Sequence, residues 1–323
     1  MENFNKWVSR NKHPDSRLAA AVLVNCTRRK TVRPSEEMRA VSLPICSQRD
    51  LETVWLDRVN KLAGVRPAGA LYSSHGFRLA QRAARIARAP VYVVSAGLGL
   101  VAADCVIPSY GITIGGRGDD LVSARAAGGF DPSDWWSAVS QGRFATPLVQ
   151  ALSDSPRRPV LVGLTRPYAV MLASALSELP EQDVARLRII GLRLNELLPP
   201  HLQASTLPYD ERLDAVLPGT RSDFAQRAVL HFVTQGLSVF PHADATDHRD
   251  WVTATLADQK APPRPKRARH SDQGIMTVVE RHLHSTQGIG RLLRVLREVE
   301  GIACEQARFA RLYRTVISRR TAG

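Results

Sequence analysis

The chain has 323 residues, of which 44% are hydrophobic and 23% charged, a mixture typical of folded globular proteins rather than disordered ones. It carries 44 Lys and Arg against 30 Asp and Glu, and the resulting net charge of +14 favours polyanionic partners, nucleic acid above all. Apolar runs are too short for a membrane-spanning helix, and the first residues lack the apolar stretch of a secretory signal. The four cysteines show neither zinc-site spacing nor a disulfide framework, so we expect a cytoplasmic protein with no metal and no cofactor.

The first 250 residues alternate short apolar runs with segments of helical periodicity. The runs predict strands at 20–24, 91–94, 160–164 and 187–192. The periodic segments predict helices at 68–89, at 131–153, from 165 onward and at 220–235. Strands separated by helices predict an α/β domain over residues 1–255, with a parallel sheet covered by helices on both faces.

The rest of the chain is strongly basic, with 13 Lys and Arg against 5 Asp and Glu in residues 261–323. Prolines and neighbouring cations predict an extended linker at 256–272, which is either a solvated tether or an arm that contacts phosphates through Lys266 and Arg267. Two apolar stripes on either side of a glycine turn predict a helical, basic region at 273–323. That region is either a helix-turn-helix-like nucleic-acid-binding bundle or a hairpin that caps the main domain.

A polar and basic segment, NCTRRK at 25–30, directly follows the first predicted strand. Ligands of parallel sheets bind at the carboxyl ends of the strands, so this loop is a candidate site for an anion or a base edge. The alternatives are a satisfied turn with exposed cations and, for the cysteine, a small packing residue. The side chains predicted to bind DNA phosphates here and after the third strand are Arg28, Arg29, Lys30 and Arg166.

Two further segments combine small and aromatic residues. LYSSHGF at 71–77 lies on a predicted helix, and its rings are either core residues or a stacking surface for a base. SAGLGLVAAD at 95–104 follows the second strand, and its glycines allow close approach of a ligand. Asp104 ends that segment among small apolar residues, where a desolvated carboxylate can act as a general base for water; a helix cap or a salt bridge is the alternative. Asp119 and Asp120 are the next acidic candidates.

These segments share a distinctive order and spacing: CTxxK at 26–30, LYxSxxF at 71–77, then SAxxGL and DxxIxxY at 95–110. The pattern resembles that of bacterial proteins of the uracil-DNA-glycosylase-like superfamily, among them antiviral DNA glycosylases that remove glucosylated hydroxymethylcytosine from phage DNA. The resemblance spans residues 20–114 and implies a three-layer α/β/α fold with a mostly parallel central sheet and a base pocket at the strand ends. The water-activating and DNA-gripping motifs of uracil-excising enzymes are missing, so uracil is not the expected substrate.

The resemblance implies a monofunctional DNA glycosylase that excises a modified base, expected to be glucosylated hydroxymethylated cytosine, and leaves abasic sites in phage DNA. Its partner is double-stranded DNA carrying that base, with no membrane and no obligate protein partner. The predicted catalytic residues are Asp104 and Asn25. The predicted base-binding residues are Cys26, Ser74, Phe77, Ser95, Gly99 and Tyr110. The alternatives are a non-catalytic module that recognises modified DNA and an enzyme that modifies deazapurine nucleosides.

Overall fold

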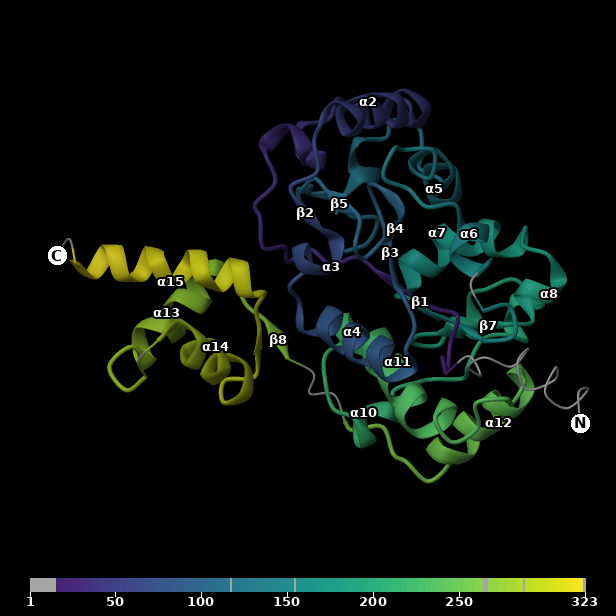
Figure 1. Ribbon diagram of the computed structural model, residues 1–323. Coiled ribbons are helices and arrows are strands. Elements are labelled where there is room, and N and C mark those ends of the chain that lie inside the picture. The colour runs from purple at the N-terminus through teal and green to yellow at the C-terminus, as the bar shows by residue number, and fades with distance from the viewer. Residues whose placement is uncertain (1–15, 117, 154, 264–266, 287, 322–323) are drawn as a thin grey trace, which may run out of the picture. The chain divides into compact units, whose positions relative to one another are not determined.

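A computed structural model of the chain describes residues 16–116, 118–153, 155–263, 267–286 and 288–321 (Figure 1). The chain divides into two compact units, one ending at Ala261 and the other beginning at Pro262, and each has its own buried apolar core. The predicted linker at 256–272 is therefore too long, because β8 (Ala268–Arg269) already belongs to the second unit. Within the described ranges, no helix has the length and apolar character needed to cross a membrane.

The first unit contains a central sheet, a small second sheet and the helices around them. Its strands are β1 (Ala21–Asn25), β2 (Arg66–Pro67), β3 (Val91–Ser95), β4 (Gly99–Ala102), β5 (Val106–Ile107), β6 (Val160–Gly163) and β7 (Leu187–Ile190). Its α-helices are α2 (Gln48–Lys61), α3 (Ala68–Leu71), α4 (His75–Ala87), α5 (Pro132–Val139), α6 (Leu148–Ser153), α7 (Arg166–Ser177), α8 (Glu181–Val184), α9 (Pro200–Gln203), α10 (Leu213–Val216), α11 (Phe224–His231) and α12 (Ala245–Leu256). The remaining described elements of this unit are five 3-10 turns and one π-helix. The turns are η1 (Glu36–Met38), η2 (Ala40–Ser42), η3 (Val122–Arg125), η4 (Leu194–Glu196) and η5 (Arg221–Asp223), and the π-helix is η6 (Phe232–Leu237).

The central sheet has the strand order β4-β3-β1-β6-β7. β1 pairs in parallel with both β3 and β6, and β6 pairs in parallel with β7. All five residues of β1 are buried, which explains why its sequence AVLVN is apolar up to the last position. β4 runs antiparallel to β3, with Gly99 opposite Ser95, so it carries the chain from the carboxyl edge of the sheet back to the amino edge.

Helices cover both faces of this sheet. α4 and α11 pack against each other, α4 over β1 and α11 over β6 and β7, while α5 packs on α7, α2 and β4. The result is a three-layer α/β/α arrangement with a mostly parallel sheet, which confirms the predicted fold class (Figure 1). Gly163 allows α11 to approach β6 closely, because a Cβ at this position would lie 2.6 Å from a methyl carbon of Val229.

Two of the predicted helices are interrupted by new helix starts. The segment 68–89 forms α3 and α4, because Ser74 Oγ accepts a hydrogen bond from the Phe77 amide at 3.1 Å and caps a second helix. The segment 131–153 forms α5 and α6; Asp131 caps α5, its carboxylate accepting from the Ser133 amide at 2.7 Å. Ser74 thereby marks a helix N-terminus at the carboxyl edge of the sheet.

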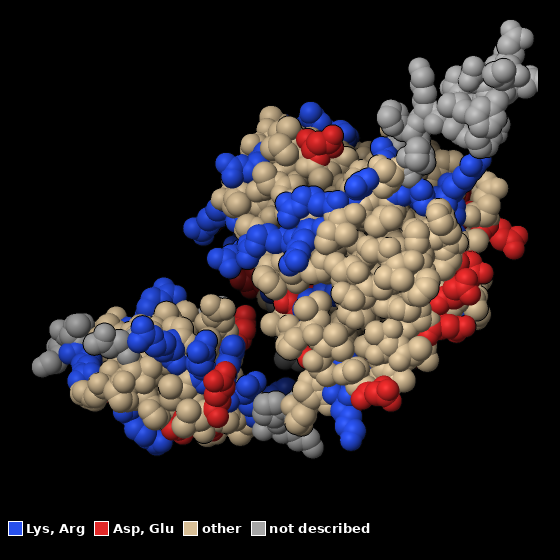
Figure 2. Space-filling view, turned by 60° about the horizontal axis from the view of Figure 1, so that its bottom comes forward, with Lys and Arg blue, Asp and Glu red and all other residues tan. Residues whose placement is uncertain are grey.

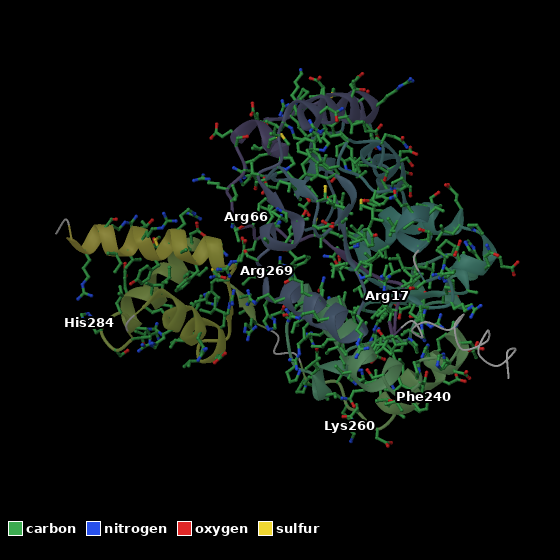
Figure 3. All side chains as sticks on the ribbon, viewed as in Figure 1. Arg17, Arg66, Phe240, Lys260, Arg269 and His284 are labelled. Atoms are coloured by element: carbon green, nitrogen blue, oxygen red, sulfur yellow. The ribbon has the colours of Figure 1, made fainter. Side chains whose placement is uncertain are left out.

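The second unit is helical and basic, as predicted. It contains β8, α13 (Asp272–His282), α14 (Ile289–Glu298), β9 (Ile302–Ala303) and α15 (Gln306–Thr321), and β8 pairs in parallel with β9. The predicted apolar stripes lie on α14 and α15 and supply buried residues such as Leu292 and Phe309. Arg269 lies on β8 and His284 beyond the end of α13 (Figure 3), and many of the basic side chains of this unit are exposed (Figure 2).

Candidate functional site

A cavity of about 640 Å³ opens at the carboxyl edge of the sheet, where β1 and β6 end. This is the position at which α/β sheets place their ligands. The cavity is lined by Asn25, Cys26, Thr27, Arg28, Arg29, Ser74, His75, Gly76, Ile112, Thr113, Gly115, Gly116, Thr165, Pro167, Tyr168, Thr220, Ser222 and Asp223. Its wall therefore combines an apolar portion with cations, hydroxyl groups and one carboxylate.

Three helical segments begin at this cavity. Ser74 caps α4, Thr165 precedes the first residue of α7 without a side-chain capping bond, and Thr220 precedes η5, which continues directly into α11. Amide groups in the first turn of a helix have no acceptor within the helix, and the helix dipole adds positive potential at that end. Here the Phe77 amide already donates to Ser74 Oγ, and Pro167 in the first turn of α7 has no amide hydrogen. Together with the exposed side chains of Arg28 and Arg29 on the same wall, these termini make the cavity suitable for an anionic ligand.

Asn25 lines the cavity as predicted, and its amide group also holds the wall together. Its Oδ1 accepts hydrogen bonds from the Thr165 backbone amide and from Gln226 Nε2, both at 3.2 Å, and its Nδ2 donates to the Cys26 carbonyl at 3.0 Å. Asn25 therefore ties the end of β1 to the start of α7 and to α11. In this arrangement it positions the wall, and its catalytic role stays a prediction.

Cys26 also faces the cavity, at the side formed by α7. Its thiol lies 3.0 Å from the Tyr168 hydroxyl, and both side chains are almost completely buried. Burial raises the pKa of Tyr168 well above its ordinary value, so the phenol remains neutral. The sulfur atom and the phenol ring give the cavity a polarisable surface suited to the face of a planar ligand.

Lys30 does not extend into the cavity with its two arginine neighbours. Its ammonium lies 4.2 Å from the centre of the Tyr110 ring and 5.4 Å from that of Tyr72, a cation–π arrangement. Burial lowers the pKa of Lys30. The prediction that Lys30 binds phosphate is therefore not supported by its position, since the aromatic rings hold its charge away from the cavity.

Three predicted base-binding residues are core residues instead. Phe77, Ser95 and Tyr110 have no exposed surface, and none of them lines the cavity. The Tyr110 hydroxyl lies 2.7 Å from that of Tyr72 and 2.5 Å from Ser95 Oγ, so these groups satisfy one another inside the protein. Gly99 has φ +71° and packs against α5, where a Cβ would lie 2.9 Å from the Val139 carbonyl oxygen. The motif at 95–110 thus builds the fold behind the cavity.

Asp104 lies away from the cavity, at the opposite edge of the sheet. Because β4 is antiparallel, the chain has returned to the amino edge by Ala102, and Asp104 is exposed in the turn that follows. The predicted desolvation of Asp104 among small apolar residues is wrong for that reason. Asp120, one of the next candidates, forms an ion pair with Arg39 at 3.1 Å.

Asp223 is the carboxylate that does line the cavity, and sequence reasoning missed it. Its Oδ1 accepts from Arg227 Nε at 2.8 Å and from the Thr220 amide at 2.9 Å, while its Oδ2 lies 3.5 Å from Nδ1 of His75. Arg227 is buried and also binds Asp214 at 2.9 Å. One carboxylate oxygen is thus anchored from behind, and the other faces the imidazole at the cavity wall. The threonine–aspartate spacing of a capping box could have drawn attention to this segment.

Arg166, a further predicted phosphate-binding residue, is not part of the cavity wall. Arg166 donates to the Arg193 carbonyl at 3.2 Å and is half-exposed. Arg267 belongs to the second unit, where it donates to the Arg297 carbonyl at 2.8 Å. Lys266 lies outside the described residues. Of the predicted site residues, the structure brings Asn25, Cys26, Arg28, Arg29 and Ser74 to one cavity.

In the part of the chain that the structure describes, no group of three His, Cys, Asp or Glu side chains is placed to hold a metal ion. Comparisons with protein-family models, curated proteins and solved structures find no match to this chain. The functional argument therefore starts from the cavity itself.

Proposed function

We propose that the cavity receives one nucleotide flipped out of double-stranded DNA and that the protein hydrolyses its N-glycosidic bond. The observation that carries this proposal is the composition of the cavity wall: two arginines and three helix N-termini beside an apolar surface and one anchored carboxylate. A volume of about 640 Å³ lies within the range of small-ligand pockets. Phosphate and base can thus be bound by chemically different parts of one site.

Asp223 is the catalytic group in this proposal. Cleavage of a glycosidic bond develops positive charge on the sugar, and a nearby carboxylate stabilises that charge and can orient the attacking water. The anchoring of Oδ1 by Arg227 fixes the carboxylate, so Oδ2 remains available at the wall next to His75. Arg28 and Arg29 bind the phosphates that flank the flipped nucleotide.

We expect hydrolysis by water without a lyase step, because a lyase step needs an amine that can reach the sugar. Lys30 is the lysine closest in sequence to the lining residues, and its ammonium lies over Tyr110 and Tyr72. Among the described residues that line the cavity there is no lysine to form a Schiff base with the sugar. The proposed enzyme is therefore monofunctional and leaves abasic sites.

The motif resemblance extends this proposal to the base and the biological role. We take glucosylated hydroxymethylated cytosine of phage DNA as the first substrate to test and antiviral defence as the role. A module that only recognises modified DNA and an enzyme that modifies deazapurine nucleosides are the competing functions.

The test uses duplexes of one sequence with canonical, hydroxymethylated or glucosylated cytosine, each probed for abasic sites under multiple turnover. We expect abasic sites in the glucosylated duplex with the wild-type protein and with Asp104→Asn, whose carboxylate lies outside the cavity. Binding to a modified duplex without abasic sites would identify a recognition module. Chemical change of a base whose glycosidic bond stays intact would identify a nucleoside-modifying enzyme.

A further inference from the structure

The outer face of α4 is entirely basic. The exposed residues of the helix and its C-terminal cap are His75, Arg78, Arg82, Arg85 and Arg88, while the residues on the opposite face are buried. Their spacing of three or four residues places them along one side of the helix. We refer to Arg78, Arg82, Arg85 and Arg88 as the α4 ridge.

Among the residues that the structure describes, the ridge has no acidic partner. Arg78 donates to the Ser73 carbonyl at 3.0 Å, and across the described ranges no carboxylate forms an ion pair with any of the four arginines. Like charges at this spacing destabilise a helix, although Arg85 and Arg88 lie at the C-terminal end of α4, where the helix dipole favours cations. Repulsion among the four arginines weakens the isolated helix, and an anionic binding partner would relieve it.

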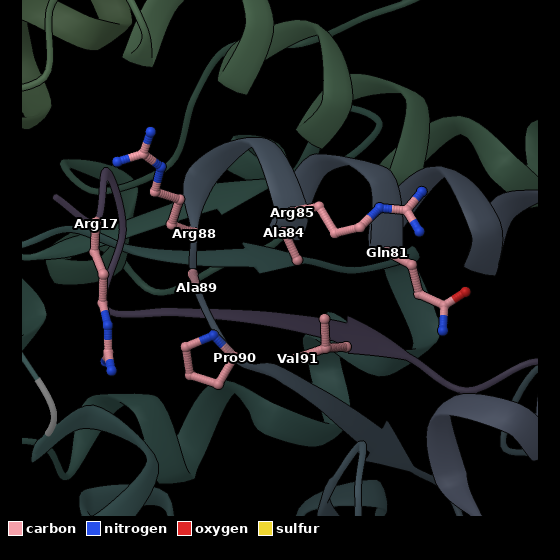
Figure 4. A pocket seen from close by; sticks show the side chains of 8 residues that line it. All are labelled: Arg17, Gln81, Ala84, Arg85, Arg88, Ala89, Pro90 and Val91. Carbon is pink, nitrogen blue, oxygen red and sulfur yellow. The ribbon is translucent and has the colours of Figure 1, made fainter.

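The ridge begins at the cavity and leads away from it. Ser74, His75 and Gly76, at the start of α4, form part of the cavity wall. At the other end, Arg85 and Arg88 join Arg17 around a second cavity of about 450 Å³ (Figure 4). With a rise of 1.5 Å per residue, the ridge from Arg78 to Arg88 extends over about 15 Å, the axial length of roughly four nucleotides of a DNA strand.

We propose that the α4 ridge binds the phosphates of the DNA strand on one side of the nucleotide in the cavity. The inference rests on the proposed function and specifies its substrate class: a polynucleotide rather than a free nucleotide or nucleoside. An anionic membrane is a less suitable partner, since helices that lie on membranes expose apolar side chains beside their cations. On α4 the apolar neighbours of the ridge, Leu79 and Ile86, are partly buried.

The experiment compares two double variants of the full chain that remove equal charge. Arg82→Gln/Arg85→Gln removes half of the ridge, and Arg49→Gln/Arg143→Gln removes two exposed arginines from the layer of α2 and α5. Binding to an unmodified duplex is measured by fluorescence anisotropy between 50 and 200 mM salt. Each lost phosphate contact reduces the slope of log affinity against log salt concentration by roughly 0.9. The slope should therefore be shallower by roughly 1.8 in the ridge variant and unchanged in the control variant.

The outcomes separate this inference from the proposed function, because binding to unmodified DNA requires no cleavage. A shallower salt slope in the ridge variant alone supports DNA binding by the ridge, even if no base is ever released. Equal losses in both variants would show that binding follows net charge, and an unchanged ridge variant would show that α4 does not contact DNA; either result overturns the inference. The inference is also overturned if the ridge variant binds DNA normally but loses binding to vesicles that contain anionic lipid. Where cleavage is observed, the ridge variant should raise KM and leave kcat unchanged.

Discussion

Replacing Asp223 by Asn removes one charge from the cavity while nearly preserving shape. The new amide oxygen can still accept from Arg227 Nε and from the Thr220 amide, which hold Oδ1 in the native protein at 2.8 and 2.9 Å. Arg227 also keeps its second carboxylate partner, Asp214. The variant therefore tests the charge that faces His75 with little change in the packing behind it.

The expected loss of stability in this variant is small and the expected loss of turnover is large, so the two effects can be distinguished. The hydrogen bond from the Thr220 amide becomes a neutral one, and the hydrogen bond from Arg227 keeps its charged donor but loses its charged acceptor, a combined loss of about 1–1.5 kcal/mol of unfolding free energy. For a unit of this size that corresponds to a fall in Tm of roughly 2–6 °C. If the carboxylate stabilises the developing positive charge, turnover should fall by about a hundredfold to a thousandfold, equivalent to about 2.7–4 kcal/mol of barrier.

The matched control is Asp214→Asn, which weakens the other ion pair of the same arginine and lies outside the cavity wall. It should lower Tm to a similar extent and leave the rate of abasic-site formation unchanged. Turnover is measured on the modified duplex at saturating protein, and DNA affinity by anisotropy. Retained turnover in Asp223→Asn, or losses of turnover that parallel Tm in both variants, would refute the role of this carboxylate.

Further predictions concern the core, the pH dependence and the second unit. Phe77→Ala should reduce unfolding free energy by about 3–5 kcal/mol because the ring is fully buried, as measured by denaturant unfolding; a stable variant with weakened DNA binding would instead place the ring against a base. His248 accepts from Arg188 Nε at 2.9 Å, and burial together with that guanidinium lowers its pKa below the ordinary 6.5. The unfolded chain then binds the proton more readily, so Tm should be constant above about pH 7.5 and fall as pH drops below 6.5, and His248→Gln should flatten that profile. Deletion of residues 262–323, which carry 13 basic and 5 acidic side chains, should lower the salt slope of DNA binding by roughly 0.9 per lost phosphate contact, while an unchanged slope would exclude this unit from the DNA interface.

The strands and the fold class could be predicted because burial on both faces imposes a visible pattern. β1, β3, β6 and β7 are short apolar runs, and the predicted bounds agree with the observed ones to within two residues. β4 is not among the predicted strands, and its direction could not be predicted in any case, since an apolar run has the same composition whichever way it pairs. That one undetermined direction moved Asp104 from one edge of the sheet to the other.

The candidate site was predictable where its residues directly follow a strand. Asn25, Cys26, Arg28 and Arg29 lie at the cavity because β1 ends there. Asp223 comes from a segment about 200 residues further along the chain, and its neighbours in sequence indicated a helix start and no chemistry. The motif resemblance implies a base-binding role for aromatic residues, but rings such as Tyr110 serve equally well in a core, and only packing distinguishes the two roles.

The hydrogen bond between Asn25 and Gln226 joins residues 201 positions apart, so the cavity wall is completed only when both ends of the first unit have folded together. Binding energy at this wall is consequently coupled to the unfolding equilibrium of the whole unit. A ligand that binds only the folded state, present at a hundred times its Kd, would add about 2.7 kcal/mol to the free energy of unfolding. Thermal-shift screening of nucleotides, modified nucleosides and short oligonucleotides can therefore detect an occupant of the cavity before any reaction has been identified.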